Sequence, residues 1–291
     1  MFSVGWFAGD RHRVLWNLGI PPRKDTVQLT IFMNQNGQNI MLEDLNDLEN
    51  SSAVTPQLLP ELKPIVCRSI SEINECLRLR YDEYCLNRSW EDADNFPEGL
   101  EQDEYDEDAV HVLLQNRSSG APVGTVRVIL KHPISPEDRS IPSFQWSDGF
   151  RDHVTGHYAS RKMMELSRFT ISRTKCQSVN RNDLAKGIFP ALALIKGFLR
   201  ATAKDKVEVV VFTTTLSLKR MLEKSGFFFH DLGIRLEHRG TRAPLYREIK
   251  PLLADLHKHN KEIWTYVTDN GQTWPLDTES PELETRRLCQ A

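Results

Sequence analysis

The sequence predicts a mixed α/β fold, in which antiparallel strands come first and alternating strands and helices follow. Residues 110–115 and 122–130 have the composition of a strand pair joined by a turn at 116–120. Beyond residue 184, apolar segments with helical spacing alternate with short runs of β-branched residues. These two patterns together favour a central mixed sheet flanked by helices.

The bulk composition excludes several classes of protein. The chain has 291 residues and a net charge of −3, so it has no overall attraction for nucleic acid or for an anionic membrane. It contains no apolar run long enough to span a membrane and no secretory leader, so we expect a cytoplasmic protein. The five cysteines and nine histidines form no metal-binding pattern.

We divide the chain into three parts. Residues 1–62 are expected to be a partly disordered N-terminal extension, because polar residues and proline dominate 34–64 and only 27–33 has strand character. Residues 63–270 are expected to form the folded domain. Residues 271–291 are a polar C-terminal tail.

The folded part is expected to contain elements in a definite order. They are a strand at 64–69, a helix at 71–87 capped by Ser71, the strand pair, a loop with a possible short helix at 131–161, a strand at 163–172, a helix at 184–203, a strand at 207–212, a helix at 217–225 closed by Gly226, a strand at 227–235, a helix at 252–260 and a strand at 264–268. Between the first helix and the strand pair, residues 91–108 contain ten carboxylates and no lysine or arginine.

The strand at 163–172 is unusual because it carries charges inside an apolar run. Alternation along a strand would place Glu165 and Ser167 on one face and Arg168 on the other. Buried charges are costly unless they are paired or hydrogen-bonded. Two interpretations follow: a structural ion pair that joins two strands, or a functional site.

Several other elements carry residues that would pair with this strand. The first helix has Arg80 and Tyr84 on one face, and Trp90 follows it. The acidic loop contains Asp103 and Asp106, and Arg127 lies in the apolar second strand of the pair. We expect these charges to converge into one network.

The motifs, taken in this order, resemble a known family. They are Arg80-x3-Tyr84-x5-Trp90, Glu101-x-Asp103-x-Tyr105-Asp106, Gly124-x2-Arg127 and Glu165-x-Ser167-Arg168. This series is similar to the signature of the LuxI-type autoinducer synthases, which have the GNAT acyltransferase fold and make N-acyl homoserine lactones from carrier-protein thioesters and S-adenosylmethionine. The resemblance covers roughly residues 65–235, and it implies a GNAT fold with a mixed sheet for this chain.

The chain departs from that family in four places, one of which is a slightly longer spacing between Trp90 and the acidic motif. Tyr84 stands where the family usually has phenylalanine, and residues 131–160 are an insertion by its standard. The run at 238–246 resembles instead the acyltransferases associated with exosortase/PEP-CTERM protein sorting and the long-chain N-acyl amino acid synthases. The acceptor amine is therefore left open between an amino acid and S-adenosylmethionine.

The resemblance implies roles for individual residues. An amine that attacks a thioester must lose a proton, and a carboxylate can accept that proton directly or through one water; Glu165 would be this general base. The backbone from Ser167 to Thr170 would hold the thioester and its oxyanion. Ser167 and Arg168 would act in catalysis beside Glu165, and Arg168 would also belong to the electrostatic scaffold. The remaining roles are an acceptor-binding and electrostatic network (Arg80, Tyr84, Trp90, Asp103, Asp106 and Arg127) and a donor or pantetheine site (Phe169, Thr170, Thr213 and Arg220).

A basic surface is the sequence signal for the acyl donor. Residues 187–250 contain twelve lysines and arginines against six acidic residues, although the whole chain is acidic. Such a surface would attract an acidic acyl carrier protein, or it is an ordinary solvated face. No glycine-rich pyrophosphate loop precedes the helix at 184, which favours a carrier protein over coenzyme A. The expected docking residues are Lys196, Arg200, Lys204, Lys219 and Lys224.

Apolar residues of the second half of the domain have two possible uses. The helix over 188–199, the strand at 207–212 and the three phenylalanines at 227–229 would line a tunnel for an acyl chain, or they are simply core.

The sequence thus favours an N-acyltransferase that uses an acyl-carrier-protein or acyl-CoA thioester and no permanently bound cofactor. Its partners would be the carrier protein and a small amine. The alternatives are an autoinducer synthase proper and a non-catalytic domain that binds acyl chains or a carrier protein.

Overall fold

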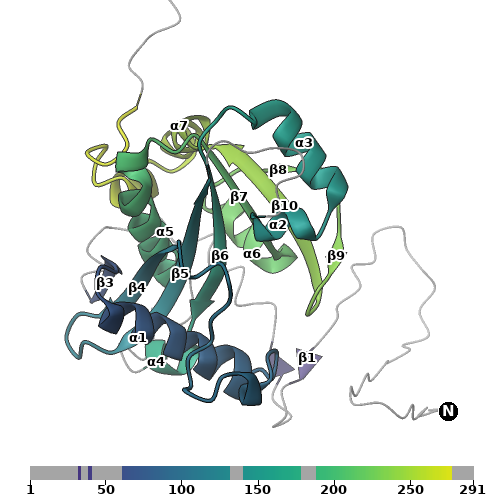
Figure 1. Ribbon diagram of the computed structural model, residues 1–291. Helices are drawn as coiled ribbons and strands as arrows, with labels where there is room; N and C mark the ends of the chain where they lie inside the picture. The colour runs from purple at the N-terminus through teal and green to yellow at the C-terminus, as the bar shows by residue number, and fades with distance from the viewer. Residues whose placement is uncertain (1–31, 34–38, 41–60, 132–139, 178–187, 277–291) are drawn as a thin grey trace, which may run out of the picture. The chain divides into compact units, whose positions relative to one another are not determined.

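The structure is a computed structural model that describes residues 32–33, 39–40, 61–131, 140–177 and 188–276. The chain divides into two units, Met1–Ser52 and Ala53–Ala291. In the first unit, β1 (Phe32–Met33) pairs with β2 (Asn39–Ile40) in an antiparallel arrangement. Everything that follows concerns the second unit (Figure 1).

An open mixed sheet forms the centre of this unit, as the sequence predicted. Its strand order is β3-β4-β5-β6-β7-β10-β8, and β9 pairs with β10. All described pairs are antiparallel except β6 with β7, which is parallel. The strands are β3 (Leu62–Val66), β4 (Val110–Asn116), β5 (Pro122–Lys131), β6 (Met163–Ile171), β7 (Val209–Thr215), β8 (His230–Asp231), β9 (Leu236–Glu237) and β10 (Thr241–Glu248).

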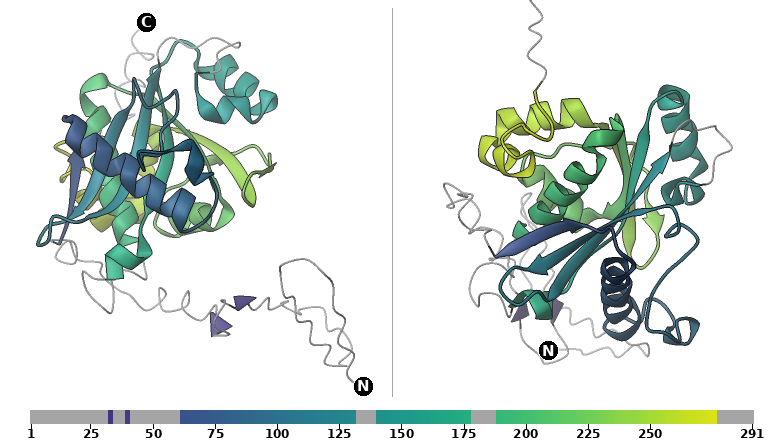
Figure 2. Two further views of the ribbon diagram at one scale, coloured as in Figure 1. Left: turned by 60° about the horizontal axis from the view of Figure 1, so that its bottom comes forward. Right: turned by 60° about the vertical axis from the view of Figure 1, so that its left-hand side comes forward.

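Helices cover both faces of the sheet (Figure 2). One face carries α1 (Ile70–Tyr81), the π-helix η3 (Asp82–Leu86), α2 (Pro142–Gln145) and α3 (Asp148–Tyr158). The other face carries α5 (Phe189–Thr202), the 3-10 turn η6 (Ala203–Asp205), α6 (Leu216–Lys224), α7 (Ile249–His259) and α8 (Lys261–Val267). The larger apolar core lies beneath α5, α7 and α8, and a smaller one lies beneath α2 and α3. Two short helices, η4 (Ala93–Asn95) and α4 (Arg173–Gln177), lie in connections.

Strand β6 has two irregularities in its middle. It pairs with β7 only from Met163 to Glu165, so the two strands separate after Glu165. On its other side, two residues of β6 lie opposite Val126 of β5, because Arg127 pairs with Ser167 and Thr125 with Thr170. This is a β-bulge. Arg168 adopts a φ of 51°, a left-handed conformation that costs free energy for a residue with a side chain.

The bulge corrects the prediction that Arg168 and Glu165 lie on opposite faces of the strand. Strict alternation would send the Arg168 side chain to the α5 face. The left-handed backbone turns it instead toward the acidic loop on the α1 face, where it meets Glu101 and Asp103.

Helix α5 lies very close to the sheet because of one glycine. A Cβ atom at Gly197 would clash with a methyl group of Val112 and would lie 3.1 Å from Cβ of Pro64. Glycine weakens a helix interior by about 1 kcal/mol relative to alanine. In return, the absence of a side chain at Gly197 allows α5 to pack closely against β3 and β4.

Several boundaries differ from the predictions. The first helix is capped by Ser69, not Ser71, because Ser69 and Glu72 form a reciprocal capping box. Residues 264–267 of the strand predicted at 264–268 belong to α8, which Thr268 caps, and most of the predicted strand at 227–235 is irregular. The sheet strand that the sequence did not predict is β10. The described part of the region at 131–161 contains two helices, where one short helix was expected. Residues 178–187, including the predicted start of α5, lie outside the described residues. Within the described ranges, no helix has the length and apolar character needed to cross a membrane.

Candidate active site

Three arginines and three carboxylates meet on the α1 face of the sheet. Arg80 comes from α1, Arg127 from β5 and Arg168 from β6, while the carboxylates come from the acidic loop. The contacts are Arg80 Nη1 and Nη2 to Asp106 at 2.7 and 2.9 Å, Arg80 Nε to Glu101, Arg127 Nη1 to Asp106 at 3.0 Å and to Asp103, and Arg168 Nη2 to Glu101 at 2.9 Å and to Asp103 at 2.8 Å. Charged residues from four separate segments therefore come together in one network, as the sequence predicted.

This network is buried and internally balanced. Arg80 and Arg127 are 0% and 1% exposed, and such guanidinium groups are tolerated only when they are paired. Burial raises the pKa of Asp106, but the hydrogen bonds and charge of Arg80, with the charge of Arg127, outweigh burial and hold that pKa well below its usual range. Burial lowers the pKa of the neighbouring His111 and so favours its neutral form.

Glu165 lies next to this network but does not pair with it. It is 2% exposed, and it accepts hydrogen bonds from the backbone N–H of Ser143 at 2.9 Å and from the Ser143 hydroxyl at 3.1 Å. Thr213 of β7 in turn donates its hydroxyl to Ser143 at 2.8 Å. The three side chains form a directed chain of hydrogen bonds from Thr213 through Ser143 to Glu165.

Burial sets the protonation of Glu165. It raises the pKa of this carboxyl to about 8, although the two hydrogen bonds from Ser143 and the charges of Arg127 and Arg168 act in the opposite direction. A carboxyl with such a pKa changes charge near neutrality, which suits a group that accepts and releases protons.

The bulge of β6 joins the network to a pair of aromatic rings. Ser167 accepts a hydrogen bond from Arg127 Nε at 3.0 Å, and the hydroxyls of Tyr84 and Thr170 are hydrogen-bonded to each other. The ring of Tyr84 stacks on Trp90 with 5.7 Å between the centroids. The acceptor-side residues predicted from the sequence therefore lie together at the point where β6 and β7 separate.

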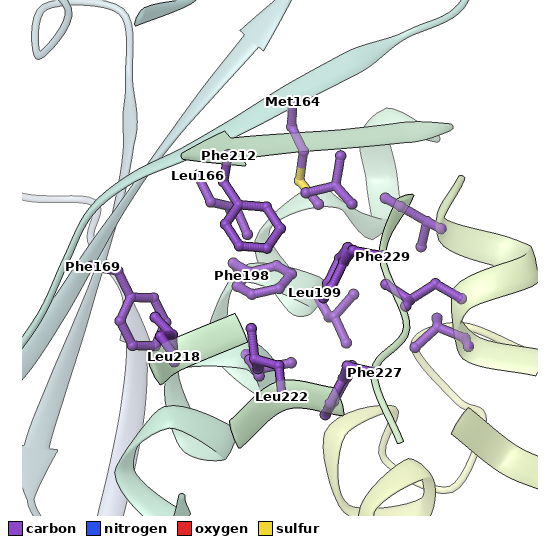
Figure 3. Close-up of a pocket in the computed structure, with 15 residues that line it drawn as sticks. Met164, Leu166, Phe169, Phe198, Leu199, Phe212, Leu218, Leu222, Phe227 and Phe229 are labelled. Carbon is purple, nitrogen blue, oxygen red and sulfur yellow. The ribbon is translucent and has the colours of Figure 1, made fainter. Parts of the chain in front are cut away.

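An apolar cavity lies on the opposite face of the same strands (Figure 3). It holds about 620 Å³ of empty space, its mouth included. Leu166 and Phe169 of β6, immediately beyond the last residue paired with β7, form one wall. The other walls come from α5, β7, α6, α7 and the segment after α6 (Ile195, Phe198, Leu199, Val210, Phe212, Leu218, Leu222, Phe227, Phe229, Ile249, Leu252 and Leu253).

The predicted donor and docking residues are scattered by comparison. Phe169 lines the cavity and Thr213 belongs to the hydrogen-bonded chain, whereas Arg220 is exposed on α6. The basic stripe on α5 is partly neutralised, because Asp269 pairs with Lys196 at 2.6 Å and with Arg200 at 2.7 Å. Lys219 pairs with Glu223 of its own helix. Lys204, which lies in η6 rather than on α5, and Lys224 are exposed.

Sequence reasoning missed Ser143 and gave no role to Glu101. Glu101 was part of the acidic motif, and its 1% exposure distinguishes it from most of the acids around it. Ser143 has no signal in its own sequence context, because it lies in the segment that resembled an insertion. No group of residues suited to hold a metal ion occurs in the described part of the chain, where four free cysteines were also found.

A family model matches part of the chain. Residues 79–178, which include the C-terminal end of α1 and all of β4, β5 and β6, match the family model of the acetyltransferase (GNAT) domain. No curated protein sequence matches the chain. The chain thus has a mixed α/β fold, and its central strands match a GNAT domain model.

Several solved structures are similar to this chain at low sequence identity. The AHL synthase LasI is 18% identical over 68% of this chain and 93% of its own, with a TM-score of 0.47. The CoA-dependent acyl-homoserine lactone synthase BjaI is 19% identical (72% and 98%, TM-score 0.46). FeeM, an N-acyl amino acid synthase from uncultured soil microbes, is 13% identical (67% and 95%, TM-score 0.45). Values at this level indicate neither the substrate nor the mechanism of this chain.

Proposed function

We propose that this protein is an N-acyltransferase that moves a fatty acyl group from a thioester to the amine of a small acceptor. The observation that carries the proposal is the chain Thr213–Ser143–Glu165, which lies where β6 and β7 separate and across those strands from an apolar cavity. Amide formation needs a proton acceptor, a place for the thioester and a place for the acyl chain. Each of these requirements has a counterpart at this point of the sheet.

The proton would travel along the hydrogen-bonded chain, because Glu165 is enclosed and its oxygens are already engaged by Ser143. The amine nitrogen attacks the thioester carbonyl carbon while Thr213 accepts the amine proton. Thr213 passes its own proton to Ser143, and Ser143 passes its proton to Glu165. The C–S bond then breaks, the amide forms, and the sulfur leaves as a thiol that takes up the proton. Glu165 is ready again once it has lost this proton.

The acyl chain would occupy the cavity on the other side of β6. Its wall begins at Leu166 and Phe169, one and four residues after Glu165, so the carbonyl group of a bound thioester would lie beside the bulge. Backbone N–H groups at a bulge are suitable donors for the developing oxyanion. Burying a fatty chain among these residues contributes roughly 0.8 kcal/mol per CH₂ group.

The nature of the two substrates remains part of this proposal. The donor is an acyl-carrier-protein or acyl-CoA thioester. The exposed Lys204, Arg220 and Lys224 support a carrier protein, because they offer positive charge to an acidic partner. The pairing of Lys196 and Arg200 with Asp269 is evidence in the other direction, because it reduces the positive charge on the surface of α5. The acceptor is an amino acid or S-adenosylmethionine. The association with exosortase systems stays a prediction from the sequence.

A transfer assay tests the proposal. The purified protein would be incubated with acyl-carrier-protein and acyl-CoA thioesters of several chain lengths and with a panel of amino acids, simple amines and S-adenosylmethionine. Release of free thiol and formation of an N-acyl product would be followed by mass spectrometry. Transfer that depends on Glu165, with Glu165→Gln folded but inactive, supports the proposal. Acyl binding without any transfer would point instead to a non-catalytic acyl-binding domain.

A further inference from the structure

Three guanidinium groups surround the indole ring of Trp90. Their central carbons lie 4.6 Å (Arg88), 5.8 Å (Arg239) and 5.6 Å (Arg242) from the ring centroid. Each such contact is favourable, but three like charges around one ring also repel one another. An arrangement of this kind is suited to an anion.

Two of the three arginines already have an acidic partner. Arg239 pairs with Glu91 at 2.6 Å, and Arg88 lies 3.8 Å from Glu83. Arg242 donates its Nε–H to the carbonyl oxygen of His238 at 2.8 Å, and within the described part of the chain its two terminal nitrogens have no carboxylate partner. Burial and the charges of Arg239 and Arg88 lower the pKa of Arg242, so a bound anion would relieve both effects.

Arg242 faces the proposed reaction centre. It lies directly opposite Thr215 in the pairing of β10 with β7, and opposed side chains share one face of a sheet. Thr213, the first member of the hydrogen-bonded chain, is two residues away on β7, which corresponds to about 7 Å along the strand. The aromatic wall reaches the same point, since Tyr84 stacks on Trp90 and is hydrogen-bonded to Thr170 of β6.

We propose that Arg242, with Trp90 and the neighbouring Arg88 and Arg239, binds the carboxylate of the acceptor, which makes the acceptor an amino acid. This inference rests on the proposed function and assigns the anionic end of its amine substrate. The side chain of Arg242 is long enough to reach along the strand toward Thr213, so its guanidinium and the Thr213 hydroxyl can hold the carboxylate and the amine of one small molecule. A sulfonium cation held beside three guanidinium groups is disfavoured by the same charges, so the site favours a simple amino acid over S-adenosylmethionine.

Two product-like probes test the site without requiring turnover. N-dodecanoylglycine and its carboxamide, N-dodecanoylglycinamide, differ only in the charge of the end group. Isothermal titration calorimetry should show that the wild-type protein binds the acid about 10- to 100-fold more tightly, because a charge-assisted arginine–carboxylate contact is worth about 1.5–3 kcal/mol. Arg242→Gln should abolish this preference while it leaves the affinity for the amide unchanged.

Arg235→Gln is the matched control. Arg235 follows β8 in the same region and is exposed, and its guanidinium pairs with Asp231, so this change removes the same charge outside the proposed site. It should leave the preference for the acid intact. Unfolding temperatures of both variants establish that they are folded.

Several results would overturn the proposal: equal binding of acid and amide by the wild-type protein, binding of neither probe, or an equal loss of affinity for both in Arg242→Gln. A raised KM for the thioester alone in Arg242→Gln would assign the arginines to phosphate groups of the donor. Failure of the proposed function is a separate outcome. A protein that prefers the acid through Arg242 but transfers no acyl group would retain the carboxylate site and lose the enzyme assignment.

Discussion

Ser143 donates two hydrogen bonds to Glu165, one from its backbone N–H and one from its hydroxyl group. Ser143 belongs to α2, a helix of four residues that begins at Pro142 and follows a stretch outside the described residues. A strand residue and a residue of a separate short helix are thus combined into one hydrogen-bonded unit, to which the proposed function assigns the acceptance of the amine proton. The consequences of this pairing can be measured.

Removal of the Ser143 hydroxyl should interrupt the proton chain. Ser143→Ala keeps the backbone hydrogen bond to Glu165 but removes the link to Thr213, so we expect kcat to fall about 10²-fold or more with little change in KM for the thioester. Thr213→Val should have a similar effect, and Thr213→Ser should retain most of the activity. Because both changes break the same chain, the double variant should lose little more than either single one. Additive losses would argue against a shared path.

The pH dependence of transfer should follow the ionisation of Glu165. Its pKa is raised to about 8 mainly by burial, against the opposing effects of Ser143, Arg127 and Arg168, so the base is mostly protonated below that pH. We expect kcat/KM to rise with pH and to level off above about 8. Steady-state kinetics across this range measure the profile. In Glu165→Gln the residual rate should lack this rise; a profile that keeps the same inflection would assign the ionisation to another group.

Disruption of the charge network should destabilise the fold. Asp106→Asn leaves the buried Arg80 without its bidentate partner, which is expected to lower the free energy of unfolding by about 3–5 kcal/mol. The pKa of Asp106 is depressed, so its contribution is present above the ordinary value of 3.8 and is lost as the pH falls below it.

Urea denaturation at neutral pH measures this loss. Asp269→Asn is the matched control, because Asp269 pairs with Arg200 and Lys196 at the surface, where such pairs contribute about 1 kcal/mol or less. Equal losses in the two variants would contradict the structural importance of the network.

A larger side chain in the cavity should shorten the acyl chain that the protein accepts. Leu222 of α6 is 6% exposed and lines the cavity, so Leu222→Trp should shift the preference toward shorter thioesters at a cost of about 1–3 kcal/mol in stability. Competition among thioesters of different length measures the shift. Leu232→Trp, which adds the same bulk at an exposed position, should leave the preference unchanged. An unaltered profile in Leu222→Trp would place the acyl chain elsewhere.

The elements with strong local patterns were predictable from the sequence. The strand pair and the apolar helix α5 were both found where their residue patterns had predicted them. The charge network was also predictable, because its members lay in apolar runs or in a dense acidic loop; they are Arg80, Asp103, Asp106, Arg127 and Arg168.

The remaining features depend on tertiary structure. The left-handed φ of Arg168 occurs in a β-bulge and directs its side chain to Glu101 and Asp103, so alternation gave the wrong face. The segment that contains Trp264 has residues compatible with a strand, yet packing beside α7 makes it a helix. Ser143 meets Glu165 only because α2 packs against β6 and β7.

The missing side chain of Gly197 has an effect beyond α5 itself. It lets the helix approach Val112 and Pro64, and the same helix carries Ile195, Phe198 and Leu199 into the wall of the cavity. Any larger residue at this position would push the whole helix outward from β3 and β4 and carry that wall with it. If the acyl chain occupies the cavity, Gly197 helps to set the length of chain that fits, although it does not line the cavity itself.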